Sequence, residues 1–237
     1  RHGPEGARLI DLARAAALSQ PTARRILKAL LEEGLLVQRA GDRRYAPGPL
    51  TAELGLARPS PTAPAERWRD LAARLALRTG GAVCVQARSG PDAVCLLRED
   101  APGAPVGPQL SPGARRPLGA GAGPLAMLAA LEEDAFSASL DAAAQELRFA
   151  MAQEPKALRR AAMGVRQRGY AVSAEMFMPG VTSVGILLPQ GGDDGGALSI
   201  AVLLLDPSPD RVAALAALLQ EEVARGPHAG AGRGSGP

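Results

Sequence analysis

Apolar side chains between positions 23 and 31 recur with the spacing of an amphipathic helix. They fall at i, i+3, i+4, i+7 and i+8, and this pattern predicts one buried stripe along the helix. The stripe consists of Ala23, Ile26, Leu27, Leu30 and Leu31. Ser19 can cap the helix N-terminus, and Pro21 is tolerated in the first turn because the N–H that proline lacks would have no helical partner there.

Two shorter elements flank this helix. Residues 7–17 predict a short helix that can pack on it, and residues 17–20 form a connection of the length found in helix-turn-helix motifs. Downstream, residues 35–49 alternate apolar and polar positions around a turn at 40–43, which predicts a small hairpin. Two helices followed by a hairpin are typical of a winged helix-turn-helix domain, whose second helix enters the major groove of DNA.

The remainder of the chain mixes helical and strand patterns. Helices are predicted at 67–81, 124–131, 132–148, 154–169 and 208–226. Strands are predicted at 82–87, 93–98, 170–175, 181–189 and 197–206, the first two forming a hairpin. This order of helix, hairpin, helices, strands and helix indicates an α+β fold with a mixed or antiparallel sheet.

Composition divides the chain into four parts. Residues 57–66 are rich in Pro and contain Ser and Thr, which predicts a linker between an N-terminal module at 1–56 and a larger domain at 67–226. Residues 227–237 are rich in Gly and predict a disordered tail.

Positive charge is concentrated in the N-terminal module. The net charge is +3, but residues 1–58 hold ten Lys and Arg against six Asp and Glu, whereas the remainder holds seventeen against eighteen. This asymmetry favours a nucleic-acid-binding module joined to a neutral one. The residues that we expect to contact DNA are Gln20, Thr22, Arg24, Arg25, Lys28, Arg43 and Arg44.

Several function classes are disfavoured by what the sequence lacks. No apolar run reaches the roughly 20 residues of a membrane-spanning helix, and two cysteines do not make a secreted disulfide framework, so a cytoplasmic location is expected. Histidine occurs only as His2 and His228, near the two ends, and no spacing typical of a metal site is present. We therefore predict no catalytic residue, metal or cofactor. Cys84 and Cys95, in predicted strands, are either buried apolar residues or a redox pair across the hairpin.

A glycine-rich loop precedes the helix predicted from Pro124. Residues 119–124, GAGAGP, let backbone N–H groups approach a ligand, and the following helix N-terminus favours an anion. The segment lacks the Lys-Ser/Thr ending of a P-loop and the spacing of a dinucleotide fingerprint. The loop is therefore either a ligand-binding segment or a simple flexible turn.

Taken together, residues 7–225 resemble the IclR family of bacterial transcription regulators. The resemblance rests on LARAAALSQPTARRILKALLEEGLLVQ followed by RYAPGPLTAELG, on GYAVSAEMFMPGVTSVGILLP, and on ALSIAVLLLD, which stand in the order and at the spacing of the family. It implies a winged helix-turn-helix domain, a linker helix and a GAF-like mixed α/β ligand-binding domain, in homodimers or tetramers. It also implies that the first helix of the winged domain lies before residue 1.

The resemblance further implies an effector pocket for a small carboxylate. Carried over residue by residue, the pocket contains Gly121, Ala122, Gly123, Ser173, Ser183, Ser199 and Ala201. Two positions depart from the family: Leu125 replaces a frequent Lys, and Ser173 stands where an acidic residue is common, although Glu175 keeps a nearby carboxylate. Because this set has no Lys or Arg, we expect a neutral or weakly anionic ligand, such as a small organic acid or aromatic compound, or no effector.

The sequence thus predicts a dimeric, effector-responsive regulator that binds double-stranded DNA, as a repressor rather than an activator. The alternative is a small-molecule-binding or redox-sensing protein of GAF type whose shortened N-terminal module does not bind DNA. Trp68, the only tryptophan, lies just beyond the linker and is either part of a dimer contact or a core anchor.

Overall fold

The computed structural model of the chain describes residues 6–57, 63–104, 111–151, 155–176, 179–189, 197–205 and 207–227. The chain divides into two compact units, Arg1–Ala63 and Pro64–Pro237. The predicted tail beyond Pro227 lies outside the described residues, as do His2, His228 and residues 58–62 of the predicted linker. Among the described residues, no helix is both long and apolar enough to cross a membrane.

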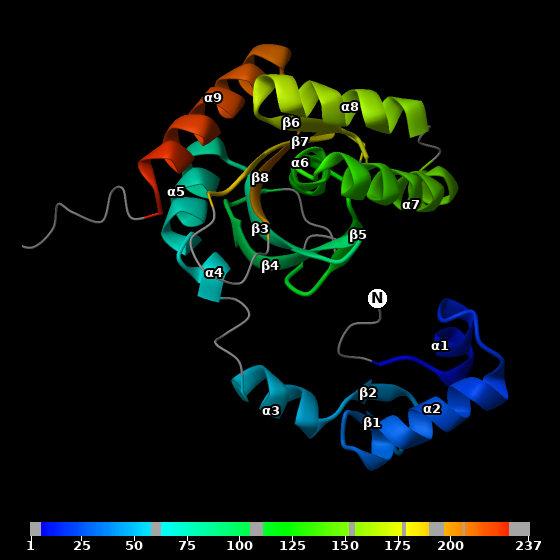
Figure 1. Cartoon of the computed structure of the whole chain (residues 1–237). Helices are drawn as coiled ribbons and strands as arrows, with labels where there is room; N and C mark the ends of the chain where they lie inside the picture. Colours follow the sequence, from blue (N-terminus) through cyan, green and yellow to red (C-terminus); the bar gives the residue numbers. More distant parts are fainter. Residues whose placement is uncertain are drawn as a thin grey trace, which may run out of the picture. The chain divides into compact units, whose positions relative to one another are not determined.

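The first unit is built around two helices and a two-stranded hairpin (Figure 1). Its elements are α1 (Leu9–Ala15), α2 (Gln20–Glu32), β1 (Leu36–Gln38), β2 (Tyr45–Pro47) and α3 (Pro49–Ala57). The two predicted helices and the antiparallel hairpin are confirmed. The predicted stripe on α2 is too wide: Ala23 and Leu27 are buried, whereas Ile26 is 43% exposed because α1 and the hairpin cover only part of the helix.

The second unit is a six-stranded antiparallel sheet with helices on both faces (Figure 1). The strands follow the order β5-β4-β3-β8-β7-β6. Their bounds are Ala82–Ser89 for β3, Asp92–Asp100 for β4, Arg115–Pro117 for β5, Ala171–Ala174 for β6, Val181–Leu187 for β7 and Leu198–Leu205 for β8. The helices are α4 (Ala63–Glu66), α5 (Arg69–Thr79), α6 (Ala122–Ala129), α7 (Glu133–Met151), α8 (Pro155–Arg168) and α9 (Pro209–Arg225).

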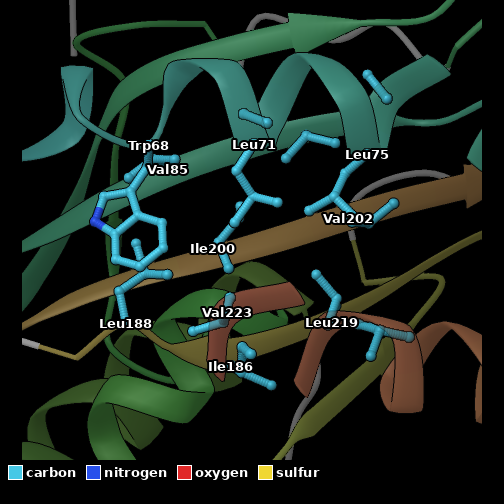
Figure 2. Close-up of a cluster of buried hydrophobic side chains, with 14 of the residues drawn as sticks. Trp68, Leu71, Leu75, Val85, Ile186, Leu188, Ile200, Val202, Leu219 and Val223 are labelled. Carbon is cyan, nitrogen blue, oxygen red and sulfur yellow. The ribbon is translucent and has the colours of Figure 1, made fainter. Parts of the chain in front are cut away.

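Helices α5 and α9 pack on one face of this sheet, and α6, α7 and α8 lie on the other. Figure 2 shows the core beneath α5 and α9, where alternate residues of β3 and β8 meet apolar side chains of both helices. Trp68 is 0% exposed in this core, which confirms its interpretation as a core anchor; a dimer contact made by the helix around it stays a prediction.

The predicted α+β class is confirmed, as are the 82–98 hairpin, the three later strands and the last helix, whose cap Ser208 accepts the backbone N–H of Arg211 at 3.3 Å. The residue pattern did not predict α3, the short helix α4 inside the proposed linker, or β5, although the family resemblance implied a linker helix after the winged domain. The helix predicted from Pro124 begins two residues earlier, at Ala122, because Gly121 forms its N-terminal boundary with φ +95°.

Candidate DNA-binding surface and effector-binding face

The N-terminus of α2 is held by a side-chain cap. Ser19 Oγ accepts the backbone N–H of Thr22 at 3.4 Å and lies 2.8 Å from the Thr22 hydroxyl. Such a cap fixes the entry of the helix and leaves its positive dipole end at the solvent-exposed first turn. Of the predicted DNA contacts, Thr22 is therefore half-buried and engaged in the cap.

Basic and polar side chains project from the exposed surface of α2. Gln20, Arg24 and Lys28 are four residues apart and share one face of the helix, and Arg25 is also exposed. Lys28 lies 3.6 Å from Glu32 on the same helix, but both side chains are largely in solvent, so this pair contributes little and can exchange for a phosphate.

The hairpin places its two predicted arginines differently. Arg43 is exposed at the turn, where its backbone has φ +53° and its carbonyl accepts a hydrogen bond from Gln38 Nε2 at 3.1 Å. Arg44 is half-buried: its guanidinium donates to the Gly6 carbonyl at 3.2 Å and lies 3.4 Å from Asp42. Arg44 therefore holds the hairpin onto the start of the unit, whereas Arg43 faces solvent.

A hollow of about 520 Å³ lies between the exposed face of α2, the start of α1 and the hairpin. It is lined by Arg8, Leu9, Ile10, Gln20, Arg24, Lys28, Leu31, Gln38, Asp42, Arg43 and Tyr45. Four of the seven predicted DNA-contacting residues thus border one concave surface. We name this surface, together with Arg25, the basic face.

The predicted effector residues come together on one face of the larger sheet. Ser173 and Ser183 are paired across β6 and β7, and Ala201 is paired with Gly185. The N-terminus of α6 lies against β7, where Ala122 contacts Ser183 and Gly123 packs on Gly185. Glycines permit this close packing, because a Cβ on Gly185 would lie 2.8 Å from the backbone nitrogen of Gly123. We name this surface the effector face.

Hydrogen bonds within the effector face engage the groups that were predicted to bind a ligand. Ser183 Oγ accepts the Ala122 N–H at 3.3 Å and donates to the Ser173 carbonyl at 3.3 Å. A Cβ on Gly123 would overlap Gln86 Oε1 and approach Ser199 Oγ to 2.7 Å. The side chains predicted to line a cavity are therefore packed against one another in this state.

Charged and polar residues that the sequence interpretation missed also lie on the effector face. Gln86 stands opposite Ser199, and both are buried; Gln86 Oε1 and Ser199 Oγ have no hydrogen-bond partner within the described residues. Arg116 is only 6% exposed and stands opposite Ala93, and Arg98 stands opposite Cys84. Two arginines that are not in the predicted set therefore lie on the same face of the sheet as that set.

These arginines could supply positive charge to a bound anion, although the sequence interpretation did not include them. Arg116 belongs to a three-residue strand in a Pro- and Gly-rich stretch, and the doublet Arg115–Arg116 was its only sign. Burial lowers the pKa of Arg116, and the neighbouring thiols Cys84 and Cys95 act against that shift. No group of three or more His, Cys, Asp or Glu in the described ranges is placed to hold a metal ion.

Comparison with known proteins identifies the N-terminal part by sequence. Residues 1–40 match the IclR helix-turn-helix domain. No curated protein matches the chain.

Comparison with solved structures covers nearly the whole chain. A protein from Silicibacter sp. TM1040, assigned to the IclR transcriptional regulators, is 23% identical with a TM-score of 0.75, over 98% of this chain and 91% of that one. An IclR family transcriptional regulator from Brucella abortus is 21% identical with a TM-score of 0.72, over 94% and 86%. An IclR homolog from Microbacterium hydrocarbonoxydans, complexed with 4-hydroxybenzoate, is 18% identical with a TM-score of 0.61, over 92% and 88%. The resemblance to IclR-type regulators is thereby confirmed for the helix-turn-helix domain and for the fold.

Proposed function

We propose that this chain, which has an IclR-type helix-turn-helix domain and the fold of IclR-type regulators, binds double-stranded DNA and regulates transcription in response to a small molecule. The observation that carries the proposal is the basic face, where Gln20, Arg24 and Lys28 project together from a capped helix. Regulation of transcription places the protein in the cytoplasm, with the chromosome, and requires no catalytic step.

The basic face fits the major groove through α2. The N-terminal residues of a recognition helix reach base edges, and basic side chains further along the helix reach phosphates. We assign base contacts to Gln20 and Arg24, and phosphate contacts to Arg25, Lys28 and Arg43. Thr22 and Arg44 support the surface through the contacts that they make within the unit.

The effector face is proposed to bind a small organic acid or an aromatic compound. The homolog from Microbacterium hydrocarbonoxydans was solved with 4-hydroxybenzoate, an aromatic acid. On this chain, Arg116 and Arg98 can balance a carboxylate, and Gln86 and Ser199 offer hydrogen-bonding atoms that pair with no described group. Binding would open the hydrogen bond between Ala122 and Ser183 and the close packing of Gly123 near Ser199. Gly121 and Ser173 would then border the opened site, with Ala201 as its apolar floor.

A second copy of the chain is the proposed partner, and repression is the proposed mode. Helix α3 exposes Leu54 and Leu56, the latter 86% exposed, and a second copy would remove such apolar side chains from water. Two copies read two half-sites, so one basic face need not supply all the affinity. A dimer bound across a promoter blocks transcription until the effector changes its affinity.

A selection of bound sequences tests the proposal. The full chain is incubated with a library of random-sequence duplexes, and retained DNA is sequenced through successive rounds. Inverted repeats with half-sites about 10 base pairs apart, or a multiple of that spacing, are expected. Arg24→Ala/Arg25→Ala should abolish enrichment, whereas Arg160→Ala, an exposed change on α8, should leave it intact. Absence of enrichment with the unchanged chain would favour the GAF-type alternative without DNA binding.

Ligand binding is tested separately by thermal unfolding with 4-hydroxybenzoate, benzoate and phenol as probes. A ligand at about 100 times its dissociation constant stabilises the folded state by about 2.7 kcal/mol. Stabilisation by the acids that Arg116→Met removes would support the effector face. Equal stabilisation of both proteins would place the ligand elsewhere.

A further inference from the structure

Two thiols lie together on the face of the sheet that also carries the effector residues. Cys84 on β3 and Cys95 on β4 are both buried, in a small cluster with Ala82, Ala104 and Leu203. They are the only cysteines of the chain, and they are not joined by a disulfide. Each thiol is hydrogen-bonded to the other across the two strands.

A β-bulge creates this pairing. Val85 pairs with Leu97 and Gln86 pairs with Cys95, so Leu96 is an extra residue on β4. Side chains alternate along a strand, and the extra residue sends Leu97 into the core beneath α5 while Cys95 turns to the face that carries Cys84. Without the bulge, Cys95 and Leu97 would share one face.

Positive charge surrounds the pair. Arg98 stands opposite Cys84 in the sheet, and Arg116 stands opposite Ala93, whose side chain lies on the same face as Cys95. The side chain of Arg98 is 8% exposed, and its guanidinium is paired with Asp100 at 2.7 Å. A thiol between buried guanidinium groups is in the kind of electropositive site that stabilises a thiolate.

We propose that Cys84 and Cys95 are a redox-sensitive pair that a hydroperoxide converts into an intramolecular disulfide. The Cys95 thiolate attacks one oxygen of the peroxide; the O–O bond breaks, Cys95 becomes a sulfenic acid, and an alcohol or water leaves after taking up a proton. Cys84 then loses its proton and attacks the Cys95 sulfur, which forms the S–S bond and releases water. The peroxide is reduced by two electrons, and the two thiols are oxidised by two.

The two cysteines have different roles in this reaction. The pKa of Cys95 is lowered, first because Cys84 donates a hydrogen bond to its sulfur and then because Arg116 and Arg98 are close. The pKa of Cys84 is raised well above its usual value by its position as the donor, by burial and by the neighbouring Cys95 charge. Burial raises the pKa of Cys95 and so opposes this lowering, whereas a backbone hydrogen bond at Leu97 adds to it. We assign the attack to Cys95 and the resolving step to Cys84, and the two cysteine variants below test this assignment.

Disulfide formation would change the shape of the effector face. The two cysteines are diagonal rather than opposite partners, and diagonal positions are normally farther apart than a disulfide spans. Closing the bond therefore shifts β4, which is bordered on its outer side only by the three-residue strand β5. Cys84 is paired with Ala201 of the effector face, so this shift reaches the residues proposed to bind the ligand.

Thiol counting tests the inference independently of DNA binding. The native full chain is treated with hydrogen peroxide, denatured and alkylated, and its intact mass is measured by mass spectrometry. A parallel sample is reduced before alkylation. We expect two alkylated cysteines before treatment and none after it, with both recovered on reduction and no covalent dimer. Two alkylated cysteines after treatment, or disulfides only between chains, would overturn the proposal. Failure to bind DNA in the reduced state would instead count against the proposed function alone.

Substitutions distinguish the proposed thiol oxidation from a purely structural role of two buried cysteines. Cys84→Ala should leave a Cys95 sulfenic acid that dimedone traps, and Cys95→Ala should leave Cys84 unreactive. Arg116→Met should slow oxidation several-fold and move the pH midpoint of the rate upward, because it removes a charge that stabilises the thiolate. Arg115→Met, on the adjacent exposed side chain, is the matched control and should change neither. Equal effects of the two arginine variants would contradict the role of Arg116.

Discussion

Gly123→Ala probes how tightly α6 is packed on the effector face. Gly123 is buried in the first turn of α6, and its backbone has no positive φ, so alanine introduces no backbone strain there. The added methyl group would overlap Gln86 Oε1 and lie 2.7 Å from Ser199 Oγ. Both side chains are buried, so neither can move into solvent without disturbing the sheet.

Two opposing free-energy contributions determine how much Gly123→Ala changes the stability of the fold. Alanine is preferred over glycine in a helix by at most about 1 kcal/mol. Overpacking of a close-packed interior costs about 1–3 kcal/mol. We therefore expect Gly123→Ala to lower the free energy of unfolding by about 1–2 kcal/mol, which corresponds to a fall of roughly 2–8 °C in melting temperature.

A second substitution determines whether Gln86 is the cause. Gln86→Ala removes the worst overlap but leaves Ser199 Oγ 2.7 Å from the added methyl group, so Gly123→Ala should cost less in that variant than in the unchanged protein. Gly164→Ala is the matched helical control, because a Cβ there meets only the Arg168 guanidinium, at 3.6 Å, and it should not destabilise.

Urea denaturation followed by tryptophan fluorescence measures these differences. Trp68 is the only tryptophan and is 0% exposed in the larger unit, so the signal reports unfolding of the unit that contains α6. The reasoning would be refuted if Gly123→Ala cost the same in the presence and absence of the Gln86 side chain.

Three further substitutions test contacts that hold the larger unit together. Glu222→Ala, which removes a buried carboxylate bonded to Arg78 at 2.7 Å across α5 and α9, should cost about 1–3 kcal/mol in urea denaturation; no loss would show that the arginine is equally well solvated by water. Ser208→Ala should lower the free energy of unfolding by about 1 kcal/mol through loss of the α9 cap, measured in the same way. Ser208→Thr keeps a capping hydroxyl and should retain most of that stability. The pKa of Glu66 is lowered chiefly by its hydrogen bond from Arg69, so this carboxylate adds stability above about pH 4.5 that is lost as the pH falls. Glu66→Gln should therefore make the melting temperature fall less steeply as the solution is acidified. An unchanged dependence of melting temperature on acid pH would contradict the pairing.

Secondary structure was predicted correctly from the sequence where local periodicity and tertiary packing agree. The strand pattern of 82–87 and 93–98 gave a correct hairpin, because both strands are long and bounded by the turn at residues 89–92. The cap at Ser19 and the start of α2 were also readable, since both depend on neighbouring residues. Such signals lie within one turn or one strand.

Features that depend on contacts between residues far apart in the sequence could not be predicted from the sequence. The exposure of Ile26 follows from how little of α2 is covered, which periodicity does not report. The position of Cys95 depends on a one-residue bulge, and a bulge reverses the faces of a strand without changing its composition. Arg116 was missed because its strand has three residues and is defined only by pairing with β4.

The candidate sites show the same difference between features set by neighbouring residues and features set by distant contacts. The α2 part of the basic face was predicted because helical spacing leaves Arg24, Arg25 and Lys28 outside the apolar stripe whatever surrounds the helix. The effector residues came from the family resemblance, and the structure brings them together. Their mutual hydrogen bonds, and the arginines beside them, could be found only from the three-dimensional arrangement.

The salt dependence of DNA binding by the basic face tests the central claim most directly. The full chain is titrated against a fluorescent duplex carrying the selected sequence, at several salt concentrations, for the unchanged protein, Arg24→Ala/Arg25→Ala and Arg160→Ala. If α2 lies against DNA, the double variant should bind more weakly, and its slope of log K against log salt should fall by about 0.9 for each phosphate that the protein no longer neutralises. Arg160→Ala should reproduce the unchanged protein. An unaltered slope and affinity in the double variant would contradict the account.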